Sequence, residues 1–124
     1  FFIGITTPLI CYFFVSFVKS RLGYDDSLDA FGCHGMGGVW GALMTGIFCT
    51  KTINDAGADG LLYGNPSQLI PQMTGIVTGI IVAVVMTTLI IKVLGSFMKV
   101  RATASEEAQG LDLIDHGERA YNKL

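Results

Sequence analysis

The segment D-D-S-L-D-A-F-G-C-H-G-M-G-G, residues 25–38, brings three carboxylates and one imidazole close together along the chain. Asp25, Asp26 and Asp29 precede His34, which lies in a stretch without charged residues. An imidazole can take up or release a proton near neutral pH, and carboxylates at a helix start bind its free amide groups. The segment therefore combines a proton carrier with a helix start, and its chemistry depends on what surrounds it.

The composition indicates that the surroundings are a membrane. Of the 124 residues, 51% are hydrophobic and only 15% are charged, whereas soluble domains average about 25% charged. A helix needs roughly 20 apolar residues to cross a bilayer. Stretches without Asp, Glu, Lys or Arg cover residues 1–18, 30–50 and 60–91. The sequence thus predicts an all-α membrane protein with transmembrane helices at about 1–20, 27–50 and 66–98, followed by a tail at 99–124.

Local signals place the ends of these helices. Gly23 is a C-terminal stop for the first helix, and Asp25 and Asp26 are suited to cap the second. Asp29, one turn further on, is suited to the same role. Asn65-Pro66 predicts the start of the third helix. Because the chain opens on apolar residues without a signal-peptide pattern, we expect it to be a piece of a longer protein.

Basic residues predict the orientation. Cytoplasmic loops are enriched in Lys and Arg. Lys19 and Arg21 lie beside the link between the first two predicted helices, and Lys92, Lys99 and Arg101 lie beside the start of the tail. Two predicted crossings separate these groups, so they lie on the same side of the membrane. The opposite loop has Lys51 with two aspartates. We therefore expect a multi-pass protein whose tail and Asp25 link lie in the cytoplasm.

His34 is the main candidate for function, because an ionisable group inside a membrane span is expensive and usually faces protein or a cavity. A packing histidine bonded to a nearby carbonyl is the alternative. A zinc site with Cys33 is disfavoured, since adjacent helical residues point about 100° apart. The three cysteines form no close pair, so no metal site is predicted. The net charge of −2 gives no reason to expect a nucleic-acid partner.

Small residues recur at helical spacing around and beyond this histidine, and such stripes let helix backbones approach closely in lipid. The stripes are Gly38, Ala42 and Gly46, then Gly37 and Gly41, and on the third helix Gly75 and Gly79. They predict tight helix packing, and glycines beside a pore would also keep it narrow.

Two motifs carry a family resemblance. The stretch D-D-S-L-D-A-F-G-C-H-G-M-G-G-V-W-G-A-L-M-T-G-I-F and the later G-L-D-L-I-D-H-G-E-R-A-Y resemble the ammonium transporter family (Amt/Mep/Rh). The resemblance covers the whole chain, as the last three of that family's eleven membrane helices plus its cytosolic tail. It implies a transporter, not an enzyme, that needs no cofactor and lies in the cell membrane.

The resemblance implies roles for four residues of the first motif. In this family two histidines from different helices share a proton in a narrow apolar pore, and His34 matches the second of them. Ammonium cannot cheaply enter a dry pore, and a buried histidine can relay its proton while ammonia crosses. Ala30, one turn before His34, is expected at the inner exit of the pore. Asp29 matches a family carboxylate below the pore, and Asp26 is expected to support the same region, although both suit helix capping.

The tail motif implies regulation. Family tails pack under the neighbouring subunit of a homotrimer, and in prokaryotes a PII-type signalling protein plugs the cytosolic mouth. The matching residues are Gly110, Asp112, His116, Gly117 and Tyr121. Ile114 stands where plant members have a phosphorylatable threonine, so that switch is not expected. Two alternatives remain: an ammonium sensor on the same scaffold, and an unrelated channel segment in which His34 is a gate or pH sensor.

Overall fold

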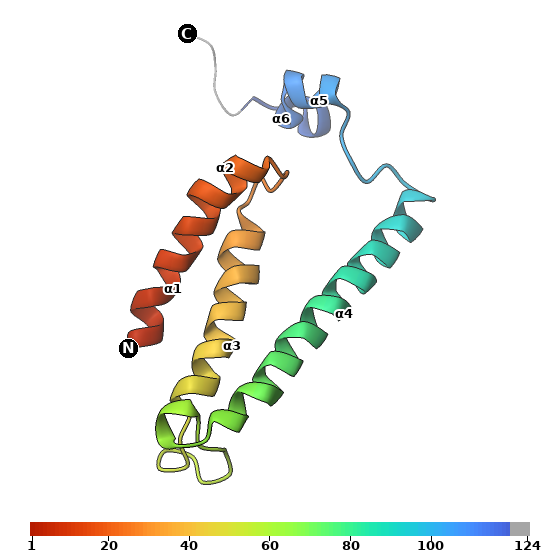
Figure 1. Ribbon diagram of the computed structural model, residues 1–124. Helices are drawn as coiled ribbons and strands as arrows, with labels where there is room; N and C mark the ends of the chain where they lie inside the picture. Colours follow the sequence, from red (N-terminus) through yellow and green to blue (C-terminus); the bar gives the residue numbers. More distant parts are fainter. Residues whose placement is uncertain (120–124) are drawn as a thin grey trace. The chain divides into compact units, whose positions relative to one another are not determined.

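The computed structural model describes residues 1–119, and all regular structure in that part of the chain is helical (Figure 1). The all-α class predicted from the sequence is therefore confirmed for these residues. The chain divides into two compact units, Phe1–Ile81 and a second that begins at Val82. Helix α4 (Leu69–Gly95) continues from the first unit into the second.

The first helix runs without a break from Phe2 to Leu22. Its segments are α1 (Phe2–Phe13), the π-helical η1 (Phe14–Val18) and α2 (Lys19–Leu22). Gly23 ends it with a φ of 64°, and its N–H donates to the carbonyl of Lys19 at 2.8 Å. Glycine adopts this left-handed conformation at little cost, which explains the stop at this position.

The second helix consists of the π-helical η2 (Phe31–Met36) and α3 (Gly37–Phe48). Helical backbone begins at Ala30, not at residue 27 as the sequence suggested. The reason is Asp29, which has a φ of 55° and is the only residue other than glycine with a positive φ in the described chain. A left-handed residue cannot continue into a right-handed helix on its N-terminal side, so residues 27 and 28 form a turn.

Glycines let the first two helices approach closely. A Cβ at Gly32 would lie 2.7 Å from Cγ2 of Val15, so the two π-helical segments meet where only glycine fits. A Cβ at Gly37 would lie 3.0 Å from Sγ of Cys11. Close backbone approach at small residues is the usual basis of helix association in membranes. The glycines therefore determine how near the second helix comes to the first.

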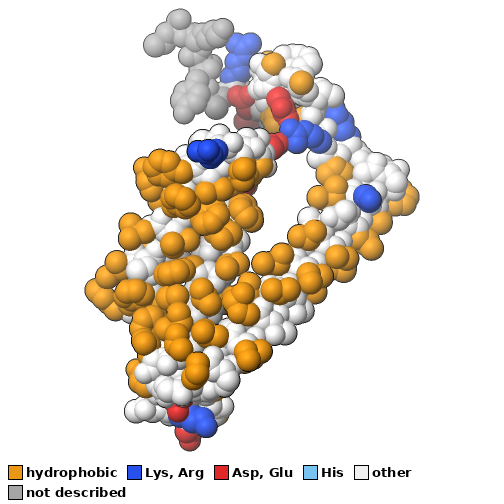
Figure 2. Space-filling model, viewed as in Figure 1, with side chains coloured by type: hydrophobic (Ala, Val, Ile, Leu, Met, Phe, Trp, Pro, Cys, Tyr) orange, Lys and Arg blue, Asp and Glu red, His pale blue; other side chains and the backbone are white. Residues whose placement is uncertain are grey.

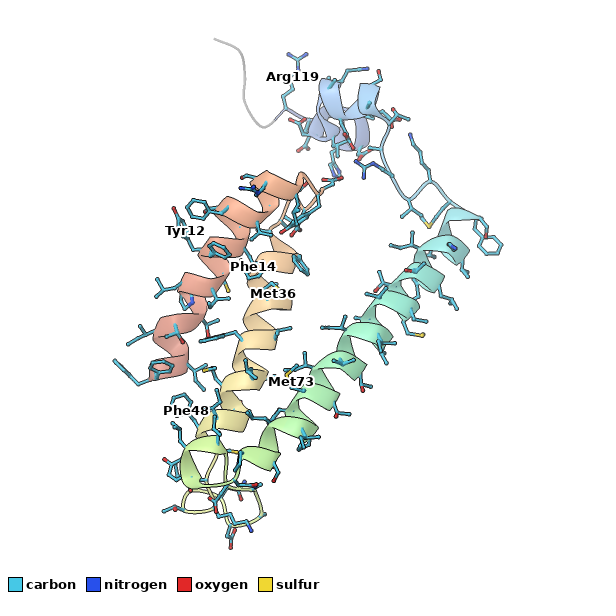
Figure 3. The ribbon with its side chains drawn as sticks, in the orientation of Figure 1. Tyr12, Phe14, Met36, Phe48, Met73 and Arg119 are labelled. Carbon is cyan, nitrogen blue, oxygen red and sulfur yellow. The ribbon has the colours of Figure 1, made fainter. Side chains whose placement is uncertain are left out.

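Aromatic and polar contacts complete this interface. Phe14 meets Phe31 edge to face with ring centroids 6.4 Å apart, and Phe2 meets Phe48 at 5.3 Å. Figure 3 shows Phe14 between the two helices and Phe48 near their far end. Between these pairs, the indole N–H of Trp40 donates to Oγ1 of Thr6 at 3.0 Å. Buried indole groups normally need such a partner, and here the partner lies on the facing helix.

The loop after α3 folds around the carboxylate of Asp59. The hydroxyl of Thr50 and the backbone N–H of Lys51 donate to its Oδ1 at 3.1 and 2.8 Å. The side-chain amide of Asn65 donates to the carbonyl of Asp59 at 2.9 Å. Two short 3₁₀ segments, η3 (Leu61–Tyr63) and η4 (Pro66–Gln68), follow and lead into α4. The loop is thus closed on itself by hydrogen bonds, and it connects α3 to α4.

Helix α4 packs against α3 near its start. A Cβ at Gly46 would lie 2.5 Å from Cγ of Gln72, so this crossing also depends on a glycine. Pro66 is the first residue of η4, as the sequence suggested, because a proline there forfeits no helical hydrogen bond. Together, Pro66–Gly95 form one helical stretch.

Apolar side chains cover the surfaces of the helices (Figure 2). Met44 is the one buried hydrophobic residue within the described part of the chain. Two helices there, Phe2–Leu22 and Pro66–Gly95, are long and apolar enough to cross a membrane by length and composition. The helix Phe31–Phe48 lies between them in sequence and is shorter. Exposed apolar surface of this extent fits contact with lipid or further protein, not with water.

The second unit contains two short helices after the end of α4. They are α5 (Ala104–Gln109) and α6 (Leu111–His116), and they contact each other. Gly110 separates them with a φ of 95°.

Gly60 provides a test of the closed loop. A Cβ at this position would lie 2.6 and 2.8 Å from the carbonyl oxygens of Gly46 and Ile47, which are backbone atoms and cannot rotate away. We predict that Gly60→Ala destabilises the complete protein by about 1–3 kcal/mol, the usual cost of overpacking. The measurement is the thermal unfolding midpoint in detergent. Gly95→Ala is the control, because its nearest neighbour, Val100, lies at 3.9 Å; equal midpoints for both variants would contradict the packing.

Candidate functional site

His34 lies in the middle of the π-helical segment η2. A π-helical turn is wider than an α-helical turn, and such segments occur frequently at functional sites. The side chain of His34 is exposed in this chain. The segment faces η1 across the Gly32–Val15 contact. His34 is therefore carried by irregular helix, two residues from a glycine contact between two helices.

The two sides of this helix differ in burial. Gly32 and Gly37, which contact the first helix, are buried, whereas His34 and Gly38 are exposed. A Cβ added at Gly38 or Gly41 would meet nothing within 4 Å. The face that bears the imidazole is thus open and lined by glycine, while the opposite face is packed. This open face leaves room for a further element close to His34.

Ala30 lines an open hollow of about 590 Å³ at the beginning of the same helix. The other residues lining it are Leu22, Tyr24, Asp25, Asp26 and Phe31. The hydroxyl of Tyr24 is buried and has no hydrogen-bond partner among residues 1–119, while its ring meets that of Phe31 edge to face. The sequence-predicted residues Ala30 and Asp26 are therefore brought together at one end of the helix.

Asp26 caps the second helix. Its Oδ1 accepts from the N–H of Ala30 and its Oδ2 from the N–H of Phe31, both at 2.9 Å. Each carboxylate oxygen thus satisfies one of the amide groups that a helix start leaves unpaired. The predicted capping role is observed for Asp26, and the N-terminal end of the helix dipole also favours a negative charge here.

Asp29 does not cap the helix. Its Oδ1 forms an ion pair with Nζ of Lys19 at 2.6 Å, and the same ammonium group donates to the carbonyl of Asp26 at 2.5 Å. The carbonyl of Asp29 accepts from the N–H of Cys33 at 2.9 Å, next to His34. Sequence reasoning missed Lys19 as a partner, because a pairing between two helices depends on a turn geometry that residue spacing does not reveal.

The predicted tail residues belong to the second unit, and the His34 group belongs to the first. Gly110 and Gly117 both have positive φ, 95° and 67°, and they bracket α6, which His116 ends. A Cβ at Gly110 would lie 2.7 Å from Oδ1 of Asp112. Both glycines are thus required by the backbone of this short helix. Tyr121, the remaining predicted residue, lies outside the described residues.

Sequence reasoning also missed a capping box at the start of α5. Thr103 accepts from the N–H of Glu106, and the carboxylate of Glu106 accepts from the N–H of Thr103 at 2.7 Å. Nζ of Lys99 contacts both oxygens of this carboxylate at 2.6 and 2.5 Å. These contacts, led by the Lys99 hydrogen bond, lower the pKa of Glu106 to about 2. The pattern T-x-x-E is visible in the sequence and would have identified the box.

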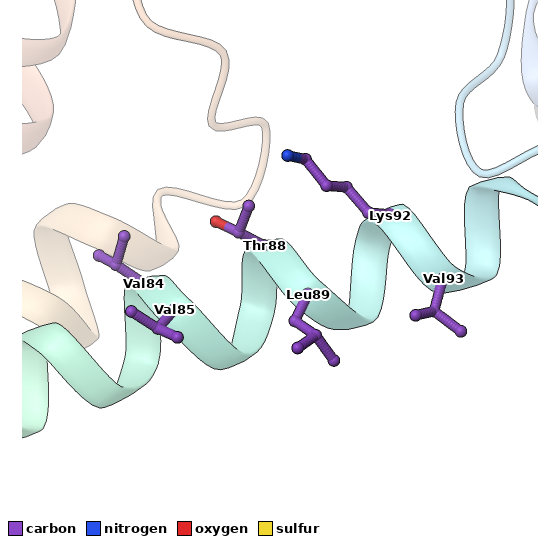
Figure 4. Close-up of a pocket in the computed structure, with 6 residues that line it drawn as sticks. All are labelled: Val84, Val85, Thr88, Leu89, Lys92 and Val93. Carbon is purple, nitrogen blue, oxygen red and sulfur yellow. The ribbon is translucent and has the colours of Figure 1, made fainter.

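A shallow apolar groove of about 450 Å³ runs along the second half of α4 (Figure 4). It is lined by Val84, Val85, Thr88, Leu89, Lys92 and Val93. All six residues belong to α4; Thr88 and Lys92 project to one side of the helix, and Leu89 and Val93 to the other. No three His, Cys, Asp or Glu side chains in the described part of the chain are grouped in a way that could hold a metal ion.

All-helical structure, two membrane-length helices and surfaces rich in apolar side chains are the features of a helical membrane protein. The sequence matches the Ammonium Transporter Family over residues 1–121. The chain therefore belongs to the ammonium transporter family.

Individual relatives agree with this assignment. The chain is 47% identical to "Ammonium transporter" from Bacillus subtilis, over 96% of this chain and 30% of the relative. It is 42% identical to "Ammonium transporter" from Aquifex aeolicus, over 98% of this chain and 28% of that relative. It is 36% identical to "Ammonium transporter Amt1" from Archaeoglobus fulgidus, over 96% of this chain and 30% of that relative. The chain thus spans about 30% of the length of the curated relatives that it matches.

The double cap of Asp26 can be tested directly. We predict that Asp26→Ala destabilises the complete protein by about 0.5–2 kcal/mol, because it leaves the N–H groups of Ala30 and Phe31 unpaired. Hydrogen exchange at these two amides should accelerate more than at the amides of α3. Ser27→Ala, an exposed change in the same turn, is the control. Unchanged exchange at Ala30 and Phe31 in Asp26→Ala would contradict the cap.

The Glu106 carboxylate predicts a pH dependence for α5. Its pKa is lowered from 4.5 to about 2, so the stabilisation is complete above about pH 4.5 and is lost as the pH falls towards 2. We expect hydrogen exchange in Ala104–Gln109 to be slow and constant above pH 4.5, after correction for intrinsic rates. Glu106→Gln should weaken the protection and make it independent of pH, because glutamine can still accept from the N–H of Thr103 but cannot form an ion pair with Lys99. Glu118→Gln is the matched control; similar exchange in both variants would show that the ion pair with Lys99 is unimportant.

Proposed function

We propose that this chain is the C-terminal part of an ammonium transporter and forms one wall of its conduction pathway. The observation that carries the proposal is the open face of the second helix, where His34 is exposed beside glycines that admit a close neighbour. Membership of the ammonium transporter family supplies the substrate, ammonium or ammonia. The chain spans only about 30% of its relatives, so the remaining wall belongs to the rest of the protein.

The selectivity of the proposed pathway depends on the free-energy cost of moving a charged group from water into an apolar pore. An ammonium ion loses much of its hydration energy in a narrow apolar pore, whereas neutral ammonia loses far less. In the proposed mechanism His34 and a second histidine from the missing part share a proton and relay it while ammonia crosses. Potassium has no proton to release, so the same pore excludes it. Ala30 lines the inner exit, with Asp26 and Asp29 supporting the helix below the relay.

We further propose that the protein is a multi-pass protein of the cell membrane with three crossings in this chain. The helix Phe31–Phe48 is short and its surface is rich in glycine, so it suits contact with other helices more than with lipid. We place it in the interior of the protein, where it crosses the membrane surrounded by other helices. Lipid contacts the apolar surface of α4. The basic residues of the first link and of the tail then lie in the cytoplasm, in accordance with the positive-inside rule.

The tail is proposed to regulate transport from the cytoplasmic side. Helix α6 exposes Leu111, Leu113 and Ile114, and two helices as short as α5 and α6 cannot form a core of their own. Docking under the neighbouring subunit of a homotrimer would cover these side chains. A PII-type signalling protein is proposed as the partner at the cytoplasmic mouth. Ile114 offers no hydroxyl for phosphorylation, so regulation depends on docking.

His34 gives the decisive test. In the complete transporter reconstituted into vesicles, we predict that His34→Ala abolishes ammonium flux, because no group remains to relay the proton. His34→Asp should retain an ion-accepting pore with weaker discrimination against potassium. The measurements are initial ammonium uptake rates and potassium flux under the same gradients.

Cys33→Ala, at the neighbouring exposed position of η2, is the matched control and should transport normally. Unchanged ammonium flux and unchanged discrimination against potassium in both His34 variants would reject the relay. Ammonium-dependent signalling by the intact protein without any flux would instead favour a sensor.

A further inference from the structure

The ammonium group of Lys19 occupies a small, well-defined site between the first two helices. Nζ lies 2.6 Å from Oδ1 of Asp29 and 2.5 Å from the carbonyl oxygen of Asp26. The two side chains of the ion pair are 29% and 35% exposed. A charged carboxylate and a backbone carbonyl thus converge on one –NH₃⁺ group. These are hard oxygen acceptors of the kind that any ammonium ion prefers.

Hydrogen bonds that do not involve Lys19 hold the backbone around both acceptors. Asp29 has a φ of 55°, and its N–H donates to the carbonyl of Asp26 at 3.2 Å. Its own carbonyl accepts from the N–H of Cys33 at 2.9 Å. The carboxylate of Asp26 is fixed by the N–H groups of Ala30 and Phe31. The backbone that carries the two acceptors is therefore held by hydrogen bonds in which Lys19 takes no part.

This site lies directly before Ala30, at the end of the helix where the cargo is proposed to leave. We propose that Lys19 acts as a tethered ammonium group that occupies an ammonium-binding site at the inner mouth and so keeps the cargo from being retained there. The inference rests on the proposed function, because it takes ammonium as the cargo. Lys19 is thus a specificity-determining residue outside the histidine relay.

Stability does not account for this arrangement. Partly exposed ion pairs contribute little to stability, because solvent screens them and the long side chain loses entropy. A tethered group, in contrast, has an effective local concentration in about the millimolar range, so free ammonium at lower concentrations competes poorly for the site. Masking Asp29 therefore matters more for the cargo than for the fold.

The test uses the complete transporter in vesicles, with initial rates measured over a range of ammonium concentrations. Lys19→Met keeps the apolar stem and removes the charge. We expect its maximal rate and its half-saturation concentration to fall together, by up to roughly fivefold, the range available to an exposed ion pair. Their ratio should stay constant, because only release of the cargo is slowed. A purely structural defect would lower the maximal rate alone.

Asp29→Asn in the Lys19→Met background should raise both parameters above those of Lys19→Met alone, because the vacated site then carries no charge. Asparagine tolerates the left-handed conformation of residue 29, so the turn is retained. Lys19→Arg should remain close to wild type, since a cation still faces the carboxylate. Arg21→Ala, an exposed basic residue in the same helix, controls for the change in charge and should also match wild type.

Two results would overturn the inference. One is Lys19→Met with unchanged maximal rate and half-saturation; the other is a double variant as slow as Lys19→Met. Absence of ammonium flux in the wild-type protein would instead reject the proposed function itself. Assembly of each variant is verified by size-exclusion chromatography and thermal unfolding. If Lys19→Met fails to assemble, Lys19→Arg carries the comparison. A joint fall of the maximal rate and the half-saturation concentration in Lys19→Arg would also contradict masking.

Discussion

The contact between Gly32 and Val15 is the constraint on which the rest of the first unit depends. At this point a Cβ on residue 32 would lie 2.7 Å from Cγ2 and 3.3 Å from the backbone nitrogen of Val15, so only glycine fits. Because one face of the second helix is committed to this contact, its opposite face is left open, and that face carries His34. A larger residue at position 32 would force the two helices apart. Packing and chemistry are therefore coupled through one glycine.

The start of the second helix shows how a short polar turn can orient an apolar helix. Asp26 satisfies two amide groups, Asp29 adopts a left-handed conformation, and Lys19 bonds to both residues from the preceding helix. Each interaction alone is modest. Asp26 and Asp29 fix where the helix begins, and Lys19 adds a partly exposed ion pair that contributes little to stability.

Much of the helical organisation could be predicted from composition and local signals. Charge-free stretches, Gly23 and the cap at Asp26 all follow from rules that act within a few residues. The left-handed Asp29 could not be predicted, because aspartate adopts that conformation only when its surroundings favour it. The π-helical segments were likewise missed, since they arise from packing between helices. The capping box at Thr103 obeys a local rule and was predictable, whereas the ion pair of Lys19 depends on the folded turn.

The closed loop around Asp59 has a consequence for how the molecule can be handled. Its hydrogen bonds join residues on either side of the loop tip, so the tip itself lies outside the closed ring. Residues 51–57 are exposed, and Ile53 is 89% exposed. Exposed tips of this kind accept foreign segments, because the anchoring bonds isolate the helices from what happens beyond them. An epitope or a fluorescent label inserted there would report which side of the membrane the loop occupies without disturbing the two helices that it joins.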